Sequence, residues 1–138
     1  MIGSSEILYH GTLTPGIKKF EPRRRFVPGG IENIPARIYA TDDPAFAAMH
    51  SFPWSSDEGI DIIEYDGKLV LQVPKIFKER LNTPVYIYQL PADTFILTEE
   101  EETGNTYHSD VAVAPKDVSA FSSVIEAVEH YGCSVAFA

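Results

Sequence analysis

The chain has 138 residues, of which 44% are hydrophobic and 22% charged, a composition typical of one globular domain with its own core. Its net charge of −9 argues against nucleic-acid binding, which needs cationic side chains to displace counterions. No apolar run approaches the roughly 20 residues of a membrane helix, and the start MIGSSEILYH lacks the basic and apolar regions of a signal peptide. We therefore expect a single domain over 1–138, with no membrane contact.

Sulfur and imidazole groups are sparse. The single cysteine, Cys133, excludes an internal disulfide framework and a cysteine-built zinc site, and we expect it to be a small buried apolar residue. The four histidines show no close paired spacing, so no metal site is predicted. These features favour a reduced, cytoplasmic setting.

Short apolar runs predict a protein built mainly of strands. Several of these runs alternate polar and apolar residues or are rich in Val, Ile and Tyr. Asp66-Gly67, between two of the runs, predicts a hairpin turn. The expected strands are Glu6–His10, Arg37–Ala40, Ile60–Tyr65, Lys68–Val73, Val85–Leu90, Thr94–Thr98 and Asp110–Ala114.

Two stretches predict helices. TDDPAFAAMHSF begins with Thr41 or Asp42 as the cap and carries acidic residues and Pro44 in its first turn. FPWSSDEG after it is expected to be a loop that either covers a pocket or only connects two elements. KDVSAFSSVIEAVEHYG predicts a second helix that ends at Gly132. Its apolar face would hold Val118, Phe121, Val124, Ile125, Val128 and Tyr131. Because strands outnumber helices and do not alternate with them, we expect an α+β domain.

The stretch ILYHGT is a short apolar strand that runs directly into His10, Gly11 and Thr12. A strand end followed by a turn is one explanation of this pattern. A ligand site is another, because glycine lets a ligand approach the backbone closely. The stretch alone leaves both explanations open.

Positive charge is concentrated near this stretch. Residues 1–40 carry six Lys or Arg and three Glu, whereas residues 41–138 carry five basic and seventeen acidic residues. The run Arg23–Arg25 is either a solvated loop or a phosphate-binding group, for which the guanidinium fork is well shaped. The patch suits a dinucleotide or a small anionic group and is small for a nucleic-acid groove.

A second stretch, ARIYATDDPAFAAMHSF, is a strand ending at Tyr39 that leads through Ala40 and Thr41 into a capped helix. Together with LYHGT, about thirty residues earlier, it resembles the ADP-ribosyltransferase family. Within that family it is similar to the diphtheria-toxin and poly(ADP-ribose) polymerase branch, with its His-Tyr-Glu constellation. The resemblance covers residues 6 to about 52. It implies a split β-sheet core of two antiparallel sheets with few short helices.

The resemblance implies that NAD is the substrate. His10 would hydrogen-bond to the adenosine ribose, the backbone of Gly11 would hold the nicotinamide carboxamide, and Tyr39 would stack on the nicotinamide ring. The remaining NAD-binding positions that the resemblance implies are Thr12, Arg25 at the pyrophosphate, Ala40, Thr41, and His50 eleven residues after the tyrosine.

The third residue of the family's constellation is a glutamate at the start of a later strand, where it contacts the nicotinamide ribose. This sequence departs from that pattern. In YHSDVAVAP the preferred register places Ser109 at the position of the glutamate, as the third catalytic residue beside His10 and Tyr39. A shift of one residue would turn the other face of the strand to the site. The alternatives are His108, Asp110 and the acidic run Glu99–Glu102, which is otherwise a solvated turn.

Without the glutamate, the resemblance implies transfer of a single ADP-ribose rather than chain building. The expected function is an NAD-dependent mono-ADP-ribosyltransferase that cleaves the nicotinamide–ribose bond. Its acceptor is unidentified, and the net charge favours a protein over a nucleic acid. The alternative is a catalytically silent module of the same fold that binds NAD, a nucleotide or a protein. An unrelated α+β domain with chance motif matches is a third interpretation.

Overall fold

The computed structural model describes residues 6–26, 33–99 and 105–138. Its strands are β1 (Ile7–Thr12), β2 (Arg23–Phe26), β3 (Asn33–Thr41), β4 (Asp61–Tyr65), β5 (Lys68–Val73), β6 (Val85–Pro91), β7 (Ile96–Glu99), β8 (Thr106–Ser109), β9 (Asp117–Phe121) and β10 (Ser134–Phe137). The two α-helices are α1 (Pro44–Met49) and α2 (Val124–His130). Short 3-10 helices cover Ser56–Glu58, Lys75–Leu81 and Ala92–Thr94.

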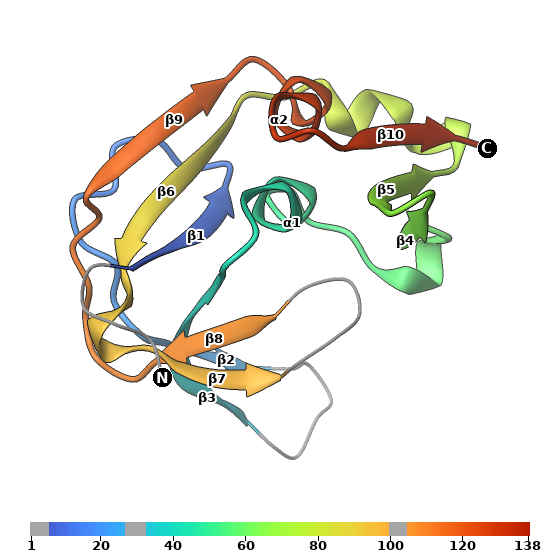
Figure 1. The fold of residues 1–138 in the computed structure, drawn as a ribbon. Helices are drawn as coiled ribbons and strands as arrows, with labels where there is room; N and C mark the ends of the chain where they lie inside the picture. Colours follow the sequence, from blue (N-terminus) through green and yellow to red (C-terminus); the bar gives the residue numbers. More distant parts are fainter. Residues whose placement is uncertain (1–5, 27–32, 100–104) are drawn as a thin grey trace.

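The described strands form two mostly antiparallel sheets (Figure 1). The larger sheet has the order β7-β8-β3-β1-β6-β9, with β2 paired to β3. The smaller sheet has the order β10-β5-β4, in which β10 and β5 are parallel. The prediction of a strand-dominated domain with two largely antiparallel sheets and few short helices is confirmed.

Helix α1 lies between the two sheets (Figure 1) and packs on β1 and α2. The larger sheet separates two hydrophobic clusters, which lie on its two faces. One cluster joins α1 and α2 to both sheets and includes Met49, Leu71 and Ile87. The other lies on the opposite face of the larger sheet and includes Leu8 and Tyr88. The three alanines of α1, in PAFAAM, allow its close packing against a strand on one side and a helix on the other.

The hairpin predicted at Asp66-Gly67 is confirmed. β4 and β5 pair in register up to Tyr65 opposite Lys68. Asp66 and Gly67 have φ angles of 53° and 78°, and two consecutive positive values are those of the tight turn that matches strand twist.

The predicted C-terminal helix starts too early. Its first residues form β9, which pairs with β6 over its whole length, and Val118 is 44% exposed rather than in the core. The helix begins only after Ser123, whose side chain accepts a hydrogen bond from the Glu126 backbone N–H at 3.1 Å. Its predicted end is confirmed, because Gly132 has a φ of 85° and Cys133 N–H donates to Val128 O.

The strand predicted over Asp110–Ala114 is also misplaced, because β8 ends at Ser109. The Ser109 hydroxyl donates to Val111 O at 2.9 Å and accepts from Val111 N–H at 3.3 Å, which turns the chain out of the ladder. Val113 forms only an isolated bridge with Phe20. β2 was not predicted at all, since its RRRF sequence has no apolar alternation.

Two local predictions differ in detail. The cap of α1 is Asp43 rather than Thr41 or Asp42, with Asp43 Oδ1 accepting from Ala45 N–H at 2.9 Å. Thr41 Oγ1 instead accepts from Asp43 N–H at 3.2 Å and fixes the turn before the helix. Cys133 is half-buried against the first cluster rather than fully buried.

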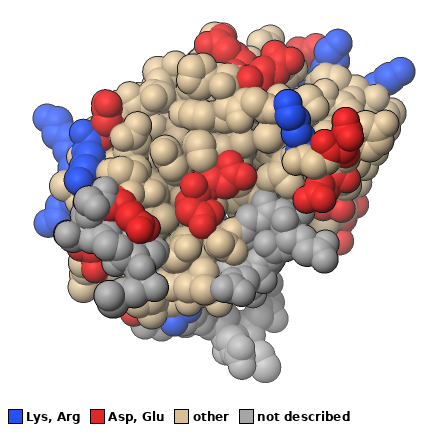
Figure 2. Space-filling model, in the orientation of Figure 1, with Lys and Arg blue, Asp and Glu red and all other residues tan. Residues whose placement is uncertain are grey.

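Acidic side chains lie in several separate groups across the face of the molecule drawn in Figure 2, with no continuous basic surface on its described part. This distribution fits the net charge of −9 and offers little to a polyanion on that face. Within the described residues, the helices are too short or too polar to cross a bilayer.

Candidate functional site

A cavity of about 410 Å³ lies where β1, β3 and α1 meet. In the described residues β1 pairs with β3 only at Tyr9 and Thr41, whereas it pairs with β6 along its whole length. The sheet is therefore open beside the end of β1. The lining residues are Tyr9, His10, Gly11, Tyr39, Ala40, Thr41, Phe46, Ala47, His50 and Thr106. Six of them are residues that the sequence resemblance singles out, and they come from two strands and from the C-cap of α1.

His10 bridges the gap between the two strands. Its Nδ1 lies 2.6 Å from Tyr39 O, and a carbonyl oxygen can only accept, so Nδ1 carries the hydrogen. In the neutral ring Nε2 is then an acceptor. Burial lowers the pKa of His10, an effect that the bond to Tyr39 O only partly offsets. The imidazole is therefore neutral near pH 7 and can accept a hydrogen bond from a ligand hydroxyl.

Gly11 is required by packing, whatever the ligand. A Cβ at this position would lie 2.1 Å from Ala47 O and 3.0 Å from the Cβ of Ser51. Only glycine allows α1 to approach β1 so closely, and this approach brings His50 toward the cavity. The sequence pattern His-Gly thus has a structural cause here, which adds to the proposed role of the glycine backbone in binding.

Aromatic rings form one wall of the cavity. Phe46 and His50 both line it, and their ring centroids are 4.5 Å apart. Trp54 stacks on His50 at 5.2 Å with an interplanar angle of 19°, and its indole N–H donates to Met49 O at 2.8 Å. Desolvation lowers the pKa of His50, so this ring too is neutral near pH 7. With Tyr39, these rings give the cavity neutral faces suited to a planar, positively charged heterocycle.

A second cavity, of about 580 Å³, adjoins the first. The two share the lining residues His10, Gly11 and His50 and are therefore adjacent, and we refer to them as the two lobes of the site. Thr12 lies in the second lobe, together with Leu13, Thr14 and the segment Ser51–Trp54. The loop after α1 therefore borders the site rather than only connecting two elements.

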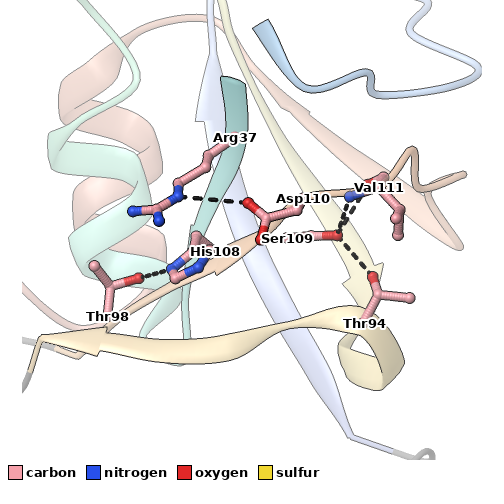
Figure 3. A network of polar contacts seen from close by, with 7 residues as sticks. All are labelled: Arg37, Thr94, Thr98, His108, Ser109, Asp110 and Val111. Carbon is pink, nitrogen blue, oxygen red and sulfur yellow. Dashed lines mark hydrogen bonds and ion pairs between the residues drawn. The ribbon is translucent and has the colours of Figure 1, made fainter. Parts of the chain in front are cut away.

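The structure does not bring Ser109 to the cavity. Antiparallel pairing sets Tyr39 opposite His108 and Ile38 opposite Ser109, so Ser109 shares the face of Ile38, which is part of the second hydrophobic cluster. Figure 3 shows His108 and Ser109 leaving β8 in different directions, toward Thr98 and Thr94 respectively. Ser109 is fully buried, and its hydroxyl is 2.8 Å from that of Thr94.

Thr106, the first residue of β8, is the residue of this strand that lines the cavity. It pairs with Thr41. Asn105 and Tyr107 on either side both donate to Asp42 Oδ2, at 3.1 and 3.3 Å, and so tie the start of β8 to the end of β3. Burial, followed by the negative charge of Asp42, raises the pKa of Tyr107. This clamp fixes Thr106 beside the cavity.

Some predicted site residues cannot be placed. The side chains of Arg25 and Glu99, and residues 100–102, lie outside the described part of the chain. His108 shares the face of Tyr39, their ring centroids being 6.5 Å apart, but does not line the cavity, and Asp110 is likewise outside it. The described residues contain no group of three or more potential metal ligands.

Four lining residues are not predicted from the sequence as site residues: Tyr9, Phe46, Ala47 and Thr106. Phe46 lies four residues before His50, which is one helical turn, and that spacing was a usable signal. Thr106 would have been found had β8 been predicted to begin at its true first residue.

Comparison of the chain with protein-family models, curated proteins and solved structures finds no match. The function is therefore inferred from the residues and geometry described above.

Proposed function

We propose that this chain binds NAD in the two-lobed cavity and acts as a mono-ADP-ribosyltransferase of the ADP-ribosyltransferase type. The observation that carries the proposal is the convergence of six residues singled out by the resemblance. His10, Gly11, Tyr39, Ala40, Thr41 and His50 come from separate segments and line one cavity. A chance match of two short motifs gives no reason for their side chains to meet.

The shape and chemistry of the cavity support a dinucleotide ligand. The first lobe has neutral aromatic walls for the nicotinamide ring, and the second lobe offers the hydroxyls of Thr12 and Thr14 together with Trp54. His10 lies in both lobes, where its Nε2 would accept a hydrogen bond from a ribose hydroxyl. The two lobes have the size of small-molecule sites.

In the proposed reaction the bond between nicotinamide and ribose breaks, and nicotinamide leaves as a neutral molecule with the bonding electron pair. The ribose passes through an oxocarbenium-like state, and an acceptor nucleophile attacks it and loses a proton. This chain's contribution would be to bury and orient the nicotinamide against Tyr39. Thr106 begins a strand beside the cavity, and in this proposal it would take the place of the family's glutamate and offer a neutral hydroxyl there.

One observation favours the alternative of a silent binding module. Among the described residues, those that line the first cavity include no carboxylate. Without an acidic group, activation of an acceptor must come from the acceptor itself or from the residues around it. A protein that only binds NAD would show the same cavity.

The test is whether the purified protein releases nicotinamide from NAD, with the released nicotinamide measured by chromatography. We expect His10→Ala and Tyr39→Ala to abolish release. His130→Ala and Tyr65→Ala are matched controls away from the cavity, and both should release nicotinamide like the wild type. Absence of release, combined with NAD-dependent thermal stabilisation that is lost only in the cavity variants, would support the silent module. Absence of both effects in the wild type would refute NAD binding.

A further inference from the structure

Arg37 lies on the same face of the sheet as the cavity. Side chains alternate along a strand, so Arg37, Tyr39 and Thr41 of β3 share one face. On β8, Thr106 lies opposite Thr41 and His108 opposite Tyr39. Asp110, just after the end of β8, lies beside Arg37. The result is a polar strip that begins in the cavity and ends at Arg37, about 7 Å along the strand from Tyr39.

The guanidinium of Arg37 has hydrogen-bonding capacity to spare. Its Nε is buried and has no hydrogen-bond partner. Every other buried polar side-chain atom in the described residues has one. Asp110 Oδ1 is 3.4 Å away (Figure 3), a charge contact that lacks hydrogen-bond geometry. The Arg37 side chain is 31% exposed and that of Asp110 is 64% exposed, so an ion pair of this kind is weak and open to competition.

An orphaned buried donor in a native structure calls for a missing partner. Because this donor belongs to a guanidinium, an anion is the partner that suits it best. The unpartnered Nε of Arg37 therefore points to an anionic ligand at this end of the strip.

We propose that Arg37 is an anion-binding residue that holds a carboxylate or phosphate of the acceptor beside the NAD cavity. The guanidinium fork matches either group. The anion would take the donors that Asp110 engages poorly. The assignment of this anion to the acceptor rests on the proposed function, whereas the anion site itself does not.

The test uses nuclear magnetic resonance of the full chain with inorganic phosphate as the probe, sodium chloride at equal ionic strength as the control, and acetate in a parallel titration to distinguish carboxylate from phosphate. The reporters are the Nε–H signal of Arg37, assigned by its loss in Arg37→Lys, and the backbone amide signals of residues 37–39, which remain in every variant and report binding to Arg37→Gln. We expect a saturable shift with phosphate or acetate that chloride does not produce. Arg37→Gln should weaken binding about tenfold or more, the loss expected for charge-assisted hydrogen bonds. Asp110→Asn should strengthen binding, because it removes the competing carboxylate.

The two variants act in opposite directions, so a folding defect in one cannot imitate the whole pattern. Repeating the titration with saturating ADP-ribose shows whether the anion site at Arg37 belongs to the acceptor or to NAD. We expect both ligands to bind together, and displacement of the anion would show that Arg37 holds the diphosphate of NAD, which overturns the acceptor assignment. Absence of saturation, or unchanged binding in Arg37→Gln, overturns the anion site. If ADP-ribose fails to bind while the anion still binds at Arg37, the proposed function and the acceptor assignment fail and the anion site stands.

Discussion

The Nδ1 atom of His10 lies 2.6 Å from the carbonyl oxygen of Tyr39, so the two residues that define the candidate site are joined directly. This contact links β1 to β3 where their backbones no longer pair. It also fixes the tautomer of His10, with Nε2 as an acceptor. The position of the imidazole and the course of the strand that carries Tyr39 therefore depend on each other.

The first prediction concerns pH. Burial lowers the pKa of His10 in the folded chain, so below about pH 6.5 the unfolded chain takes up a proton that the folded chain does not. The free energy of unfolding should therefore fall as the pH drops through this range, by up to about 1.4 kcal/mol per pH unit from one such group. His10→Gln keeps a donor for Tyr39 O without titrating. Urea unfolding at pH 7.5 and 5.5 should show a smaller loss for this variant, and equal losses would contradict the account.

Gly11→Ala should be strongly destabilising, because its Cβ would lie 2.1 Å from a backbone oxygen of α1. We expect a loss of about 2–3 kcal/mol in the free energy of unfolding, as for overpacked cores. Gly67→Ala is the matched control. It has open space around it and a positive φ, so it should lose only about 1 kcal/mol. A loss at Gly11 no greater than that at Gly67 would show that α1 can move away from β1 at little cost.

Ser109→Ala separates a structural from a catalytic role. The buried hydroxyl bonds to Thr94 and Val111, so its removal should lower the free energy of unfolding by about 1–3 kcal/mol. Nicotinamide release below the unfolding temperature should stay at the wild-type level, because Ser109 does not line the cavity. Loss of nicotinamide release in a Ser109→Ala protein that is still folded would show that Ser109 has a catalytic role.

Thr106→Glu should increase nicotinamide release, because it places a carboxylate at the first residue of β8, where an oxocarbenium-like ribose would be stabilised. We expect a rise of at least about tenfold, equivalent to about 1.4 kcal/mol of barrier. Asn82→Glu adds the same charge at an exposed position outside both cavities and serves as the control. If Thr106→Glu binds NAD and releases no more nicotinamide than the wild type, Thr106 does not occupy the proposed position.

The sequence was a good guide where local chemistry decides the structure. Asp66-Gly67 forms the expected hairpin because both residues tolerate positive φ, and His10 meets Tyr39 because their strands are neighbours. It failed where tertiary contacts compete with local pattern. The residues before Ser123 have helical periodicity, but pairing with β6 makes them a strand. The Ser109 hydroxyl ends β8 early, and the register of β8 on β3 places Thr106 beside the cavity. Apolar alternation alone could reveal neither feature.

Calorimetric titration of NAD into the wild type, Tyr39→Ala and Tyr65→Ala shows directly whether the chain binds NAD in the cavity. Tyr39 lines the cavity, whereas Tyr65 is 73% exposed at the end of β4. We expect the wild type and Tyr65→Ala to bind NAD with equal affinity. Binding to Tyr39→Ala should be roughly 5- to 150-fold weaker, the range expected for loss of one aromatic stacking contact. No heat of binding in the wild type, or equal binding by all three proteins, would refute NAD binding in the cavity.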